Sequence, residues 1–141
     1  MKDEQKLIWA AGFFDGEGFV TVGARGAYKG HKSLYLRVGV NHVAPEPLHV
    51  LHELFNGSLQ PQKEGSVVGN RVARTRWVLN CASAASALER LLPFLVNKKD
   101  VAKLGLELQD TMCYRGGSTP DEVRERREEI RQEIIRLNSI D

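Results

Sequence analysis

Two carboxylates, Asp15 and Glu17, stand between glycines in the segment Ala10–Gly18, which reads A-A-G-F-F-D-G-E-G. The segment closes a predicted N-terminal helix whose apolar residues recur at near-helical spacing: Leu7, Ile8, Trp9, Ala11 and Phe14. A carboxylate beside the negative end of a helix dipole is unfavourable unless a cation lies nearby. The pattern therefore predicts acidic groups that are delivered to a divalent metal. The alternative is a glycine-terminated core helix with two solvated acids.

The glycines of this segment predict a close contact between helices. Gly12 and Gly16 are four positions apart, so both lie on one helix face and leave it without side chains. Glycine inside a helix costs about 1 kcal/mol relative to alanine, which favours a compensating contact with a second helix. Gly16 and Gly18 also predict a sharp bend that ends the helix around Asp15 and Glu17.

Length and composition define one domain, residues 1–141. The sequence shows neither a secretion signal nor an apolar run near the ~20 residues that a membrane span needs. An intracellular location is therefore expected, in the cytoplasm of a prokaryote or in an organelle of a eukaryote. Cys81 and Cys113 lack ligand-like spacing, so we expect buried, inert thiols rather than a zinc site or a disulfide.

Positive charge is sorted onto two segments, although the formal net charge is only +2. The segment Phe19–His42 holds four basic residues and no acid, and Leu59–Asn80 holds four basic residues and the single acid Glu64. The rest of the chain is therefore net acidic. Such sorting indicates a polyanionic partner and makes a purely structural module improbable.

Both basic segments are predicted β-hairpins. In the first, apolar residues alternate with a basic outer face that contains Tyr35 and Arg37: Leu34, Leu36, Val38 and Val40. Its partner strand is Phe19–Arg25, joined by a loop over Gly26–Lys32. In the second, Ala73, Thr75, Trp77 and Leu79 face one way and Val72, Arg74, Arg76 and Asn80 the other, with the turn at Gly65–Asn70. Alternate arginines on a strand lie about 7 Å apart, close to two base-pair rises, which favours nucleic-acid contact over a solvated face.

Helices are predicted over Pro45–Phe55, Ser83–Phe94 and Val101–Met112, and the first is stopped by Asn56-Gly57. The string T-P-D-E at 119–122 predicts a capping box with proline at the first helical position of a charged C-terminal helix. The fold class is therefore α+β. One antiparallel sheet made of two hairpins is covered on one face by helices.

The string at 10–18 resembles, position for position, the signature of the LAGLIDADG homing endonucleases. Ala10 replaces the usual leucine, and Glu17 stands where many members have aspartate. The family's αββαββα core with its saddle-shaped sheet matches the predicted element order, with the motif helix at about 4–16 and C-terminal helices at about 100–141. The segment P-F-L-x-x-K-K at 93–99 is similar to a family segment whose lysine approaches the active site. The resemblance therefore implies that Lys98 is the corresponding lysine.

The resemblance implies a metal-dependent phosphodiester hydrolysis. Glu17 would be the main ligand of Mg²⁺, for which Mn²⁺ can substitute, and the Gly16 carbonyl would be a second ligand. Lys98 would polarise the phosphate or the attacking water, His42 would position that water, and Asp15 would cap or orient the turn. The family often has a basic residue shortly after the position of His42, and the segment at 43–47 has none.

One acidic motif cuts one strand, so the resemblance implies a homodimer in which two motif helices pair about a twofold axis. The expected interface residues are Ala11, Gly12, Asp15 and Gly16. The partner would be double-stranded DNA, with no small-molecule substrate, read over a pseudopalindromic site on the order of 20 base pairs. The expected DNA-binding residues are Arg25, Lys32, Tyr35, Arg37, Gln60, Gln62, Lys63, Arg71, Arg74 and Arg76.

The implied function is a site-specific DNA endonuclease associated with an intron or an intein. Two alternatives come from a different class. One is a LAGLIDADG-derived RNA maturase, and the other is a DNA-binding protein that does not cleave. The presence of Glu17 together with Lys98 favours cleavage.

Overall fold

The computed structural model describes residues 1–28, 31–61 and 74–140 as an α+β fold. Its main elements follow in the order α1 (Asp3–Glu17), β1 (Gly18–Tyr28), β2 (His31–His42), α2 (Glu46–Phe55), β3 (Ser58–Pro61), β4 (Thr75–Asn80), α3 (Cys81–Leu91), α4 (Lys99–Asp110) and α5 (Asp121–Asn138). Short 3₁₀ segments lie at Leu92–Phe94, Thr111–Cys113 and Gly116–Ser118. No helix in these ranges is both long and apolar enough to cross a bilayer.

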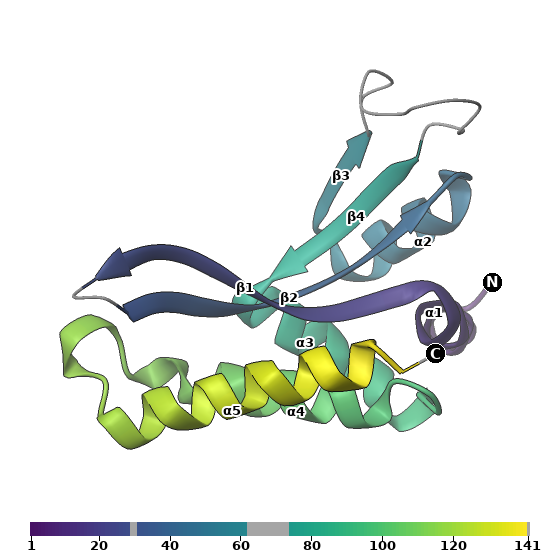
Figure 1. Cartoon of the computed structure of the whole chain (residues 1–141). Helices are drawn as coiled ribbons and strands as arrows, with labels where there is room; N and C mark the ends of the chain where they lie inside the picture. The colour runs from purple at the N-terminus through teal and green to yellow at the C-terminus, as the bar shows by residue number, and fades with distance from the viewer. Residues whose placement is uncertain (29–30, 62–73, 141) are drawn as a thin grey trace.

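The four strands form one antiparallel sheet in the order β1-β2-β4-β3. β3, β4 and the C-terminal part of β2 rise away from the outer part of the β1–β2 hairpin, because a sheet of long strands accumulates twist (Figure 1). Helices α3, α4 and α5 lie along one side of the β1–β2 pair, and the other side is left uncovered (Figure 1). The predicted α+β class and one-sided helical cover are therefore confirmed.

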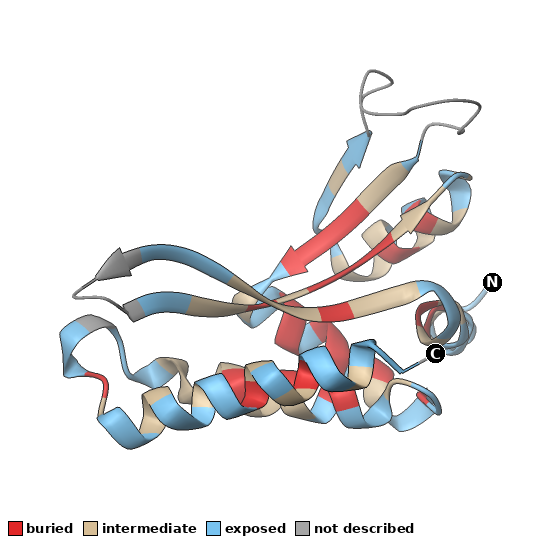
Figure 2. Ribbon diagram, in the orientation of Figure 1, coloured by how far each residue is buried: buried red, intermediate tan, exposed pale blue. Residues whose placement is uncertain are grey.

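The core lies between the sheet and the helices and follows the alternation of the strands. Leu36, Val38 and Val40 of β2 are completely buried, and across the register Val38 pairs with Leu79 and Val40 with Trp77. The buried residues concentrate where α3 meets the middle of the sheet (Figure 2). The indole N–H of the buried Trp77 has a hydrogen-bond partner, since Nε1 donates to the carbonyl of Asn56 at 2.7 Å. The alternation of these strands therefore predicted the core face.

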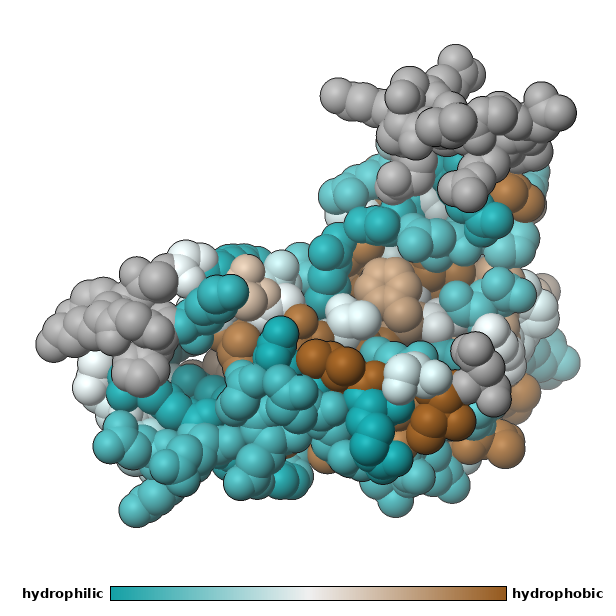
Figure 3. Space-filling model, viewed as in Figure 1, coloured by the Kyte–Doolittle hydropathy of each residue, from teal (hydrophilic) through white to brown (hydrophobic). Residues whose placement is uncertain are grey.

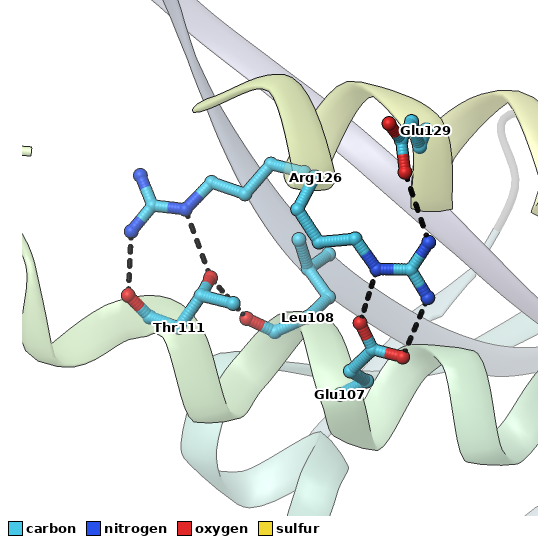
Figure 4. A network of polar contacts seen from close by, with 6 residues as sticks. Glu107, Leu108, Thr111, Arg126 and Glu129 are labelled. Atoms are coloured by element: carbon cyan, nitrogen blue, oxygen red, sulfur yellow. Dashed lines mark hydrogen bonds and ion pairs between the residues drawn. The ribbon is translucent and has the colours of Figure 1, made fainter. Parts of the chain in front are cut away.

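Helices α4 and α5 are fastened to each other by arginines of α5 (Figure 4). Arg126 Nη2 donates to Glu107 Oε1 at 2.8 Å and lowers the pKa of that carboxyl. Arg127 donates to the Thr111 hydroxyl at 2.8 Å and to the Tyr114 carbonyl at 2.9 Å. Hydrophilic side chains cover the outer surface of α5 (Figure 3). The pairing therefore leaves the inner face of α5 to bury Ile130 and Ile134.

Several element boundaries differ from the prediction. The strands of the first hairpin continue to Tyr28 and resume at His31, so the predicted loop over Gly26–Lys32 is wrong. The pairing register of β1 and β2 shifts between Arg25 and Tyr28, which lets both strands continue to the end of the hairpin. Alternation weakens in this glycine-rich stretch, and pairing with the neighbouring strand decides the structure instead. The predicted turn at Gly65–Asn70, with Val72 and Ala73, lies outside the described residues.

The predicted capping box before α5 is also wrong. Pro120 is the N-cap residue and no side chain caps the helix; the Thr119 hydroxyl is buried without a hydrogen-bond partner among the described residues. Pro120 adopts an extended backbone, so Thr119 stands one position too early to reach the helix amides. The stop at 56–57 is confirmed, since Asn56 and Gly57 have φ of 59° and 100°. Cys113 is exposed and Cys81 only half-buried, against the expectation of buried thiols.

Candidate active site and nucleic-acid interface

The end of α1 is tied to the segment before α4 by the Asp15 carboxylate. Its Oδ2 accepts hydrogen bonds from the amides of Val96 at 3.1 Å and Asn97 at 2.9 Å, and its Oδ1 accepts from the amide of Lys98 at 2.8 Å. Partial burial disfavours the charged carboxylate, but these three amides and the Lys98 ammonium outweigh it and hold the pKa of Asp15 below its ordinary value. Both carboxylate oxygens of Asp15 therefore already accept hydrogen bonds, and they hold the end of α1 against the segment before α4.

The same contact brings Lys98 to the C-terminal end of α1. The Lys98 ammonium donates to the backbone carbonyl of Asp15 at 2.8 Å, although the two residues are 83 positions apart. A cation at this end of a helix is favoured by the helix dipole. The ammonium thus bonds the residue that stands two positions before Glu17 in the chain, and the role of Lys98 in the active site stays a prediction.

Glu17 is the last residue of α1 and Gly18 the first of β1, so no linker separates helix from strand. Glu17 is exposed and forms no hydrogen bond or ion pair with a described residue. Gly18 is extended at φ −82°, so the sharp glycine bend predicted here is wrong. Glycine is needed at this position for space, because a Cβ would lie 2.5 Å from the Phe14 ring and 2.7 Å from the Phe14 carbonyl.

The described residues contain no group of three or more His, Cys, Asp or Glu side chains that could hold a metal. The described part of the chain therefore has no metal site whose ligands are all supplied by such a cluster of protein side chains. Mg²⁺ is commonly bound through only one or two carboxylates, with phosphate oxygens and waters completing the shell. The exposed Glu17 carboxylate, beside the Gly16 carbonyl at the helix end, fits that open kind of site.

His42 ends β2 and is held against α1. His42 Nδ1 lies 3.1 Å from the amide nitrogen and 3.2 Å from the carbonyl oxygen of Ala44, so the Ala44 backbone can bond Nδ1 in either neutral tautomer of the ring. The ring meets Phe13 of α1 edge-on, with 5.4 Å between ring centroids. The structure thus brings His42 to the last turns of α1, and its role in positioning water stays a prediction.

One face of α1 has no partner within the described chain. A Cβ added at Gly12 or Gly16 would meet nothing within 4 Å, and both glycines are exposed. Trp9 is 38% exposed on the same helix and stacks on Phe13 at 5.2 Å. Of the other predicted interface residues, Ala11 is completely buried in the chain's own core and Asp15 binds the segment before α4.

The sheet face opposite the helices, which we call the open face, carries polar residues on both sides of one apolar row made of Phe19, Gly39 and Val78. Cross-strand partners on it are Thr21 with Arg37, Asn41 with Arg76, and Gln60 with Arg76. Arg76 Nε donates to Asn41 Oδ1 at 2.8 Å, and Arg37 Nε is buried without a partner among the described residues. The predicted outward direction of Arg37 and Arg76 is confirmed by the register.

The remaining predicted DNA-binding residues fall into two groups. Those described and exposed or half-buried are Arg25, Lys32, Tyr35, Gln60 and Arg74. Those outside the described residues are Gln62, Lys63 and Arg71. Thr21 and Asn41 also lie on the open face and were missed, although they share the alternation of Arg37 and Arg76; Asn80 was placed on this face correctly but was not among the predicted DNA-binding residues. The same period-2 pattern could have identified them.

Comparison with known proteins identifies the fold. No protein-family model matches the chain, and no curated protein matches it. Solved structures do match, under 25% identity. The homing endonuclease I-CvuI, in complex with the I-CreI target, is 19% identical with a TM-score of 0.81, over 99% of this chain and 85% of that one. The archaeal intron-encoded homing endonuclease I-Vdi141I, complexed with DNA, is 14% identical with a TM-score of 0.79, over 99% and 88%.

A third structure, the LAGLIDADG homing endonuclease I-GzeII in complex with a DNA target, is 13% identical with a TM-score of 0.65. Here the match covers 89% of this chain but only 43% of that one. The chain therefore has the fold of the LAGLIDADG homing endonucleases. In size it corresponds to I-CvuI and I-Vdi141I, and to less than half of I-GzeII.

Proposed function

We propose that this protein is a site-specific, divalent-metal-dependent DNA endonuclease that serves intron or intein homing. The observation that carries the proposal is that Lys98 bonds the Asp15 carbonyl in the last turn of α1, the helix that ends at the exposed Glu17. The neighbours that share this fold are homing endonucleases, several of them complexed with DNA. The exposed carboxylate and the fixed ammonium are the two groups that phosphodiester hydrolysis at this position requires.

The proposed enzyme acts as a homodimer. Each chain offers one Glu17, which serves one DNA strand, so a double-strand break needs two copies. The unpartnered face with Gly12 and Gly16 supports a close pairing of two α1 helices. A twofold axis along this face would set two Glu17 carboxylates side by side at the centre of a pseudopalindromic target.

Glu17 and the Gly16 carbonyl would hold Mg²⁺, or Mn²⁺ in its place. A divalent ion at this position stabilises charge on the scissile phosphate and lowers the pKa of a bound water. Lys98, fixed by its bond to the Asp15 carbonyl, would stabilise negative charge on the same phosphate. His42 would orient the attacking water through Nε2, since the backbone of Ala44 already bonds Nδ1.

The open face would lie in the major groove of the double-stranded target. Arginines there would read guanine, and amide side chains such as Asn41 and Gln60 would read adenine. Arg37 belongs to this set, because the register places it on the open face between Thr21 and Asn80. Lys32 and Lys63 would contact phosphates and contribute affinity without selectivity.

Cleavage is tested with Glu17→Gln, which keeps size and hydrogen bonding but removes the charge. Duplexes that the wild-type protein cuts are first selected from a randomised library in Mg²⁺. The variant should bind the selected duplex with equal or slightly higher affinity, because repulsion between carboxylate and phosphate is lost, while cleavage falls below detection. Lys98→Met should slow cleavage without eliminating it. Cleavage by Glu17→Gln near the wild-type rate would place the active site elsewhere, and binding without any wild-type cleavage would favour the maturase or non-cleaving alternative.

A further inference from the structure

Three residues stack near the outer part of the β1–β2 hairpin, on the open face. Gly23 of β1 lies directly across from Tyr35 of β2. A Cβ added at Gly23 would lie 2.2 Å from Cζ and 2.5 Å from the hydroxyl oxygen of Tyr35, so the tyrosine ring occupies the space that glycine leaves empty. The Arg25 guanidinium carbon then lies 4.2 Å from the centroid of that ring.

This stack orients an arginine while leaving its hydrogen-bond donors unused. Arg25 is exposed and forms no hydrogen bond or ion pair with a described residue. Its guanidinium is planar and stacks on aromatic faces, which restricts a side chain that is otherwise highly flexible. By contrast, Arg76 has one donor committed to Asn41. Arg25 is thus held in place with its donors free for a ligand with paired acceptors.

We propose that Tyr35 is a positioning residue that fixes Arg25 for a bidentate contact with one guanine in each half-site. The inference rests on the proposed function and adds a specificity determinant to it. Guanine offers two adjacent acceptors in the major groove, which is the pattern that an oriented guanidinium matches best. The Tyr35 ring can lie over β1 because residue 23 is glycine, and any larger residue there would displace the ring.

The position of that guanine follows from the length of the strand. β1 starts at Gly18, where α1 ends and the centre of the target would lie. Arg25 is about seven residues further along, which at about 3.3 Å per residue is roughly seven base-pair rises. The guanine should therefore lie about six to eight base pairs from the centre of the site.

The test measures base preference by binding, so it does not depend on catalysis. The full-length protein and its variants select duplexes from a library randomised over the target length, in Ca²⁺, and the preference at each position is compared. Arg25→Lys keeps the charge but loses the bidentate fork, so affinity for duplexes that lack this guanine should change by less than about threefold. The guanine preference at one outer position should fall by roughly 5- to 100-fold.

Two variants that leave Arg25 intact carry the decisive comparison. Tyr35→Leu removes the ring, and Gly23→Ala displaces it, which costs little because the contacted atoms are the far end of the Tyr35 side chain. Both should relax preference at the same single position as Arg25→Lys and at no other. Tyr35→Phe should keep the preference, since the ring remains. Tyr114→Leu, which removes an exposed ring between α4 and α5, should leave every position unchanged.

The proposal is overturned if Tyr35→Leu and Gly23→Ala leave the position affected by Arg25→Lys intact, or relax many positions alike. It is also overturned if Arg25→Lys changes no position of a wild-type protein that is otherwise selective; in that case the proposed function still stands. A wild-type protein that prefers no base at any position overturns both proposals together.

Discussion

At the scale of residues, Asp15 and Lys98 are joined in both directions, since each side chain bonds the backbone of the other. We expect Asp15→Asn to destabilise the fold by about 1–2 kcal/mol, because an amide cannot accept from all three backbone N–H groups. Cleavage should fall with it, as Lys98 loses its anchor. Urea unfolding and single-turnover cleavage measure the two effects.

Asp110→Asn is the matched control for this variant, because Asp110 is an exposed carboxylate at the end of α4 whose side chain forms no bond with a described residue. Its unfolding free energy should change by less than about 0.5 kcal/mol. Equal stability of Asp15→Asn and the wild type would mean that the three amide contacts do not hold the segment before α4.

The lowered pKa of Asp15 also predicts how stability depends on pH. A carboxyl whose pKa is lower in the folded than in the unfolded state stabilises the fold above its unfolded value. That contribution is lost as pH falls through the folded pKa. The stability difference between wild type and Asp15→Asn should therefore be constant near neutral pH and shrink below about pH 4. NMR titration should place the Asp15 carboxyl below its ordinary 3.8; titration at or above that value contradicts the expectation.

The sequence indicated candidate site residues more easily than their contacts. The motif and the segment at 93–99 proposed Glu17 and Lys98, but nothing local indicated that Asp15 would bind amides more than 80 positions away. Asn41 was missed because its strand was judged by its apolar and basic residues, and an asparagine carries no signal in that pattern. Long-range partners follow from packing, which the order of residues along the chain does not reveal.

At the scale of elements, the direct junction of α1 with β1 depends on Gly18. Gly18→Ala should destabilise the protein by about 1–3 kcal/mol, because the new methyl would meet backbone as well as ring atoms of Phe14. Gly16→Ala, two positions earlier, meets nothing and should gain up to about 1 kcal/mol from helix propensity. Chemical unfolding of both variants at low protein concentration gives the comparison. A smaller loss for Gly18→Ala than for Gly16→Ala would refute the steric account.

Regular periodicity predicted the existence and type of the helices and strands, whereas their ends were less accurate. The alternation at 34–40 identified both faces of β2 correctly. The end of the first hairpin and the start of α5 were wrong, since each depends on pairing or backbone geometry rather than on residue type. Ends of elements are decided by neighbours in space, and only the interiors repeat often enough to be recognised.

At the scale of the whole molecule, the unpartnered face of α1 predicts the oligomeric state. Gly12→Leu should leave the isolated fold unchanged or up to about 1 kcal/mol more stable, because the side chain meets no atom of its own chain. It should nevertheless separate the two helices and abolish dimerisation and double-strand cleavage together. Sedimentation at micromolar concentration distinguishes the two states.

Ser86→Leu, at an exposed position of α3, serves as the control and should leave the dimer intact. A wild-type protein that sediments as a monomer and still breaks both DNA strands would contradict the pairing of two α1 helices. The same result would also require a second source for the acidic group on the other strand.

The absence of any linker between Glu17 and Gly18 fixes which face of β1 each of its residues takes relative to the end of α1. Side chains on a strand change face at every residue, so one inserted residue at this junction would turn the open-face residues of β1 toward the hydrophobic interior. Substitutions on the open face carry no such penalty, because they leave the junction untouched. If the protein is the endonuclease proposed above, new target sequences would therefore arise by point substitution on the open face, at a constant chain length between α1 and β1. Insertions and deletions at this junction would abolish recognition instead of changing it.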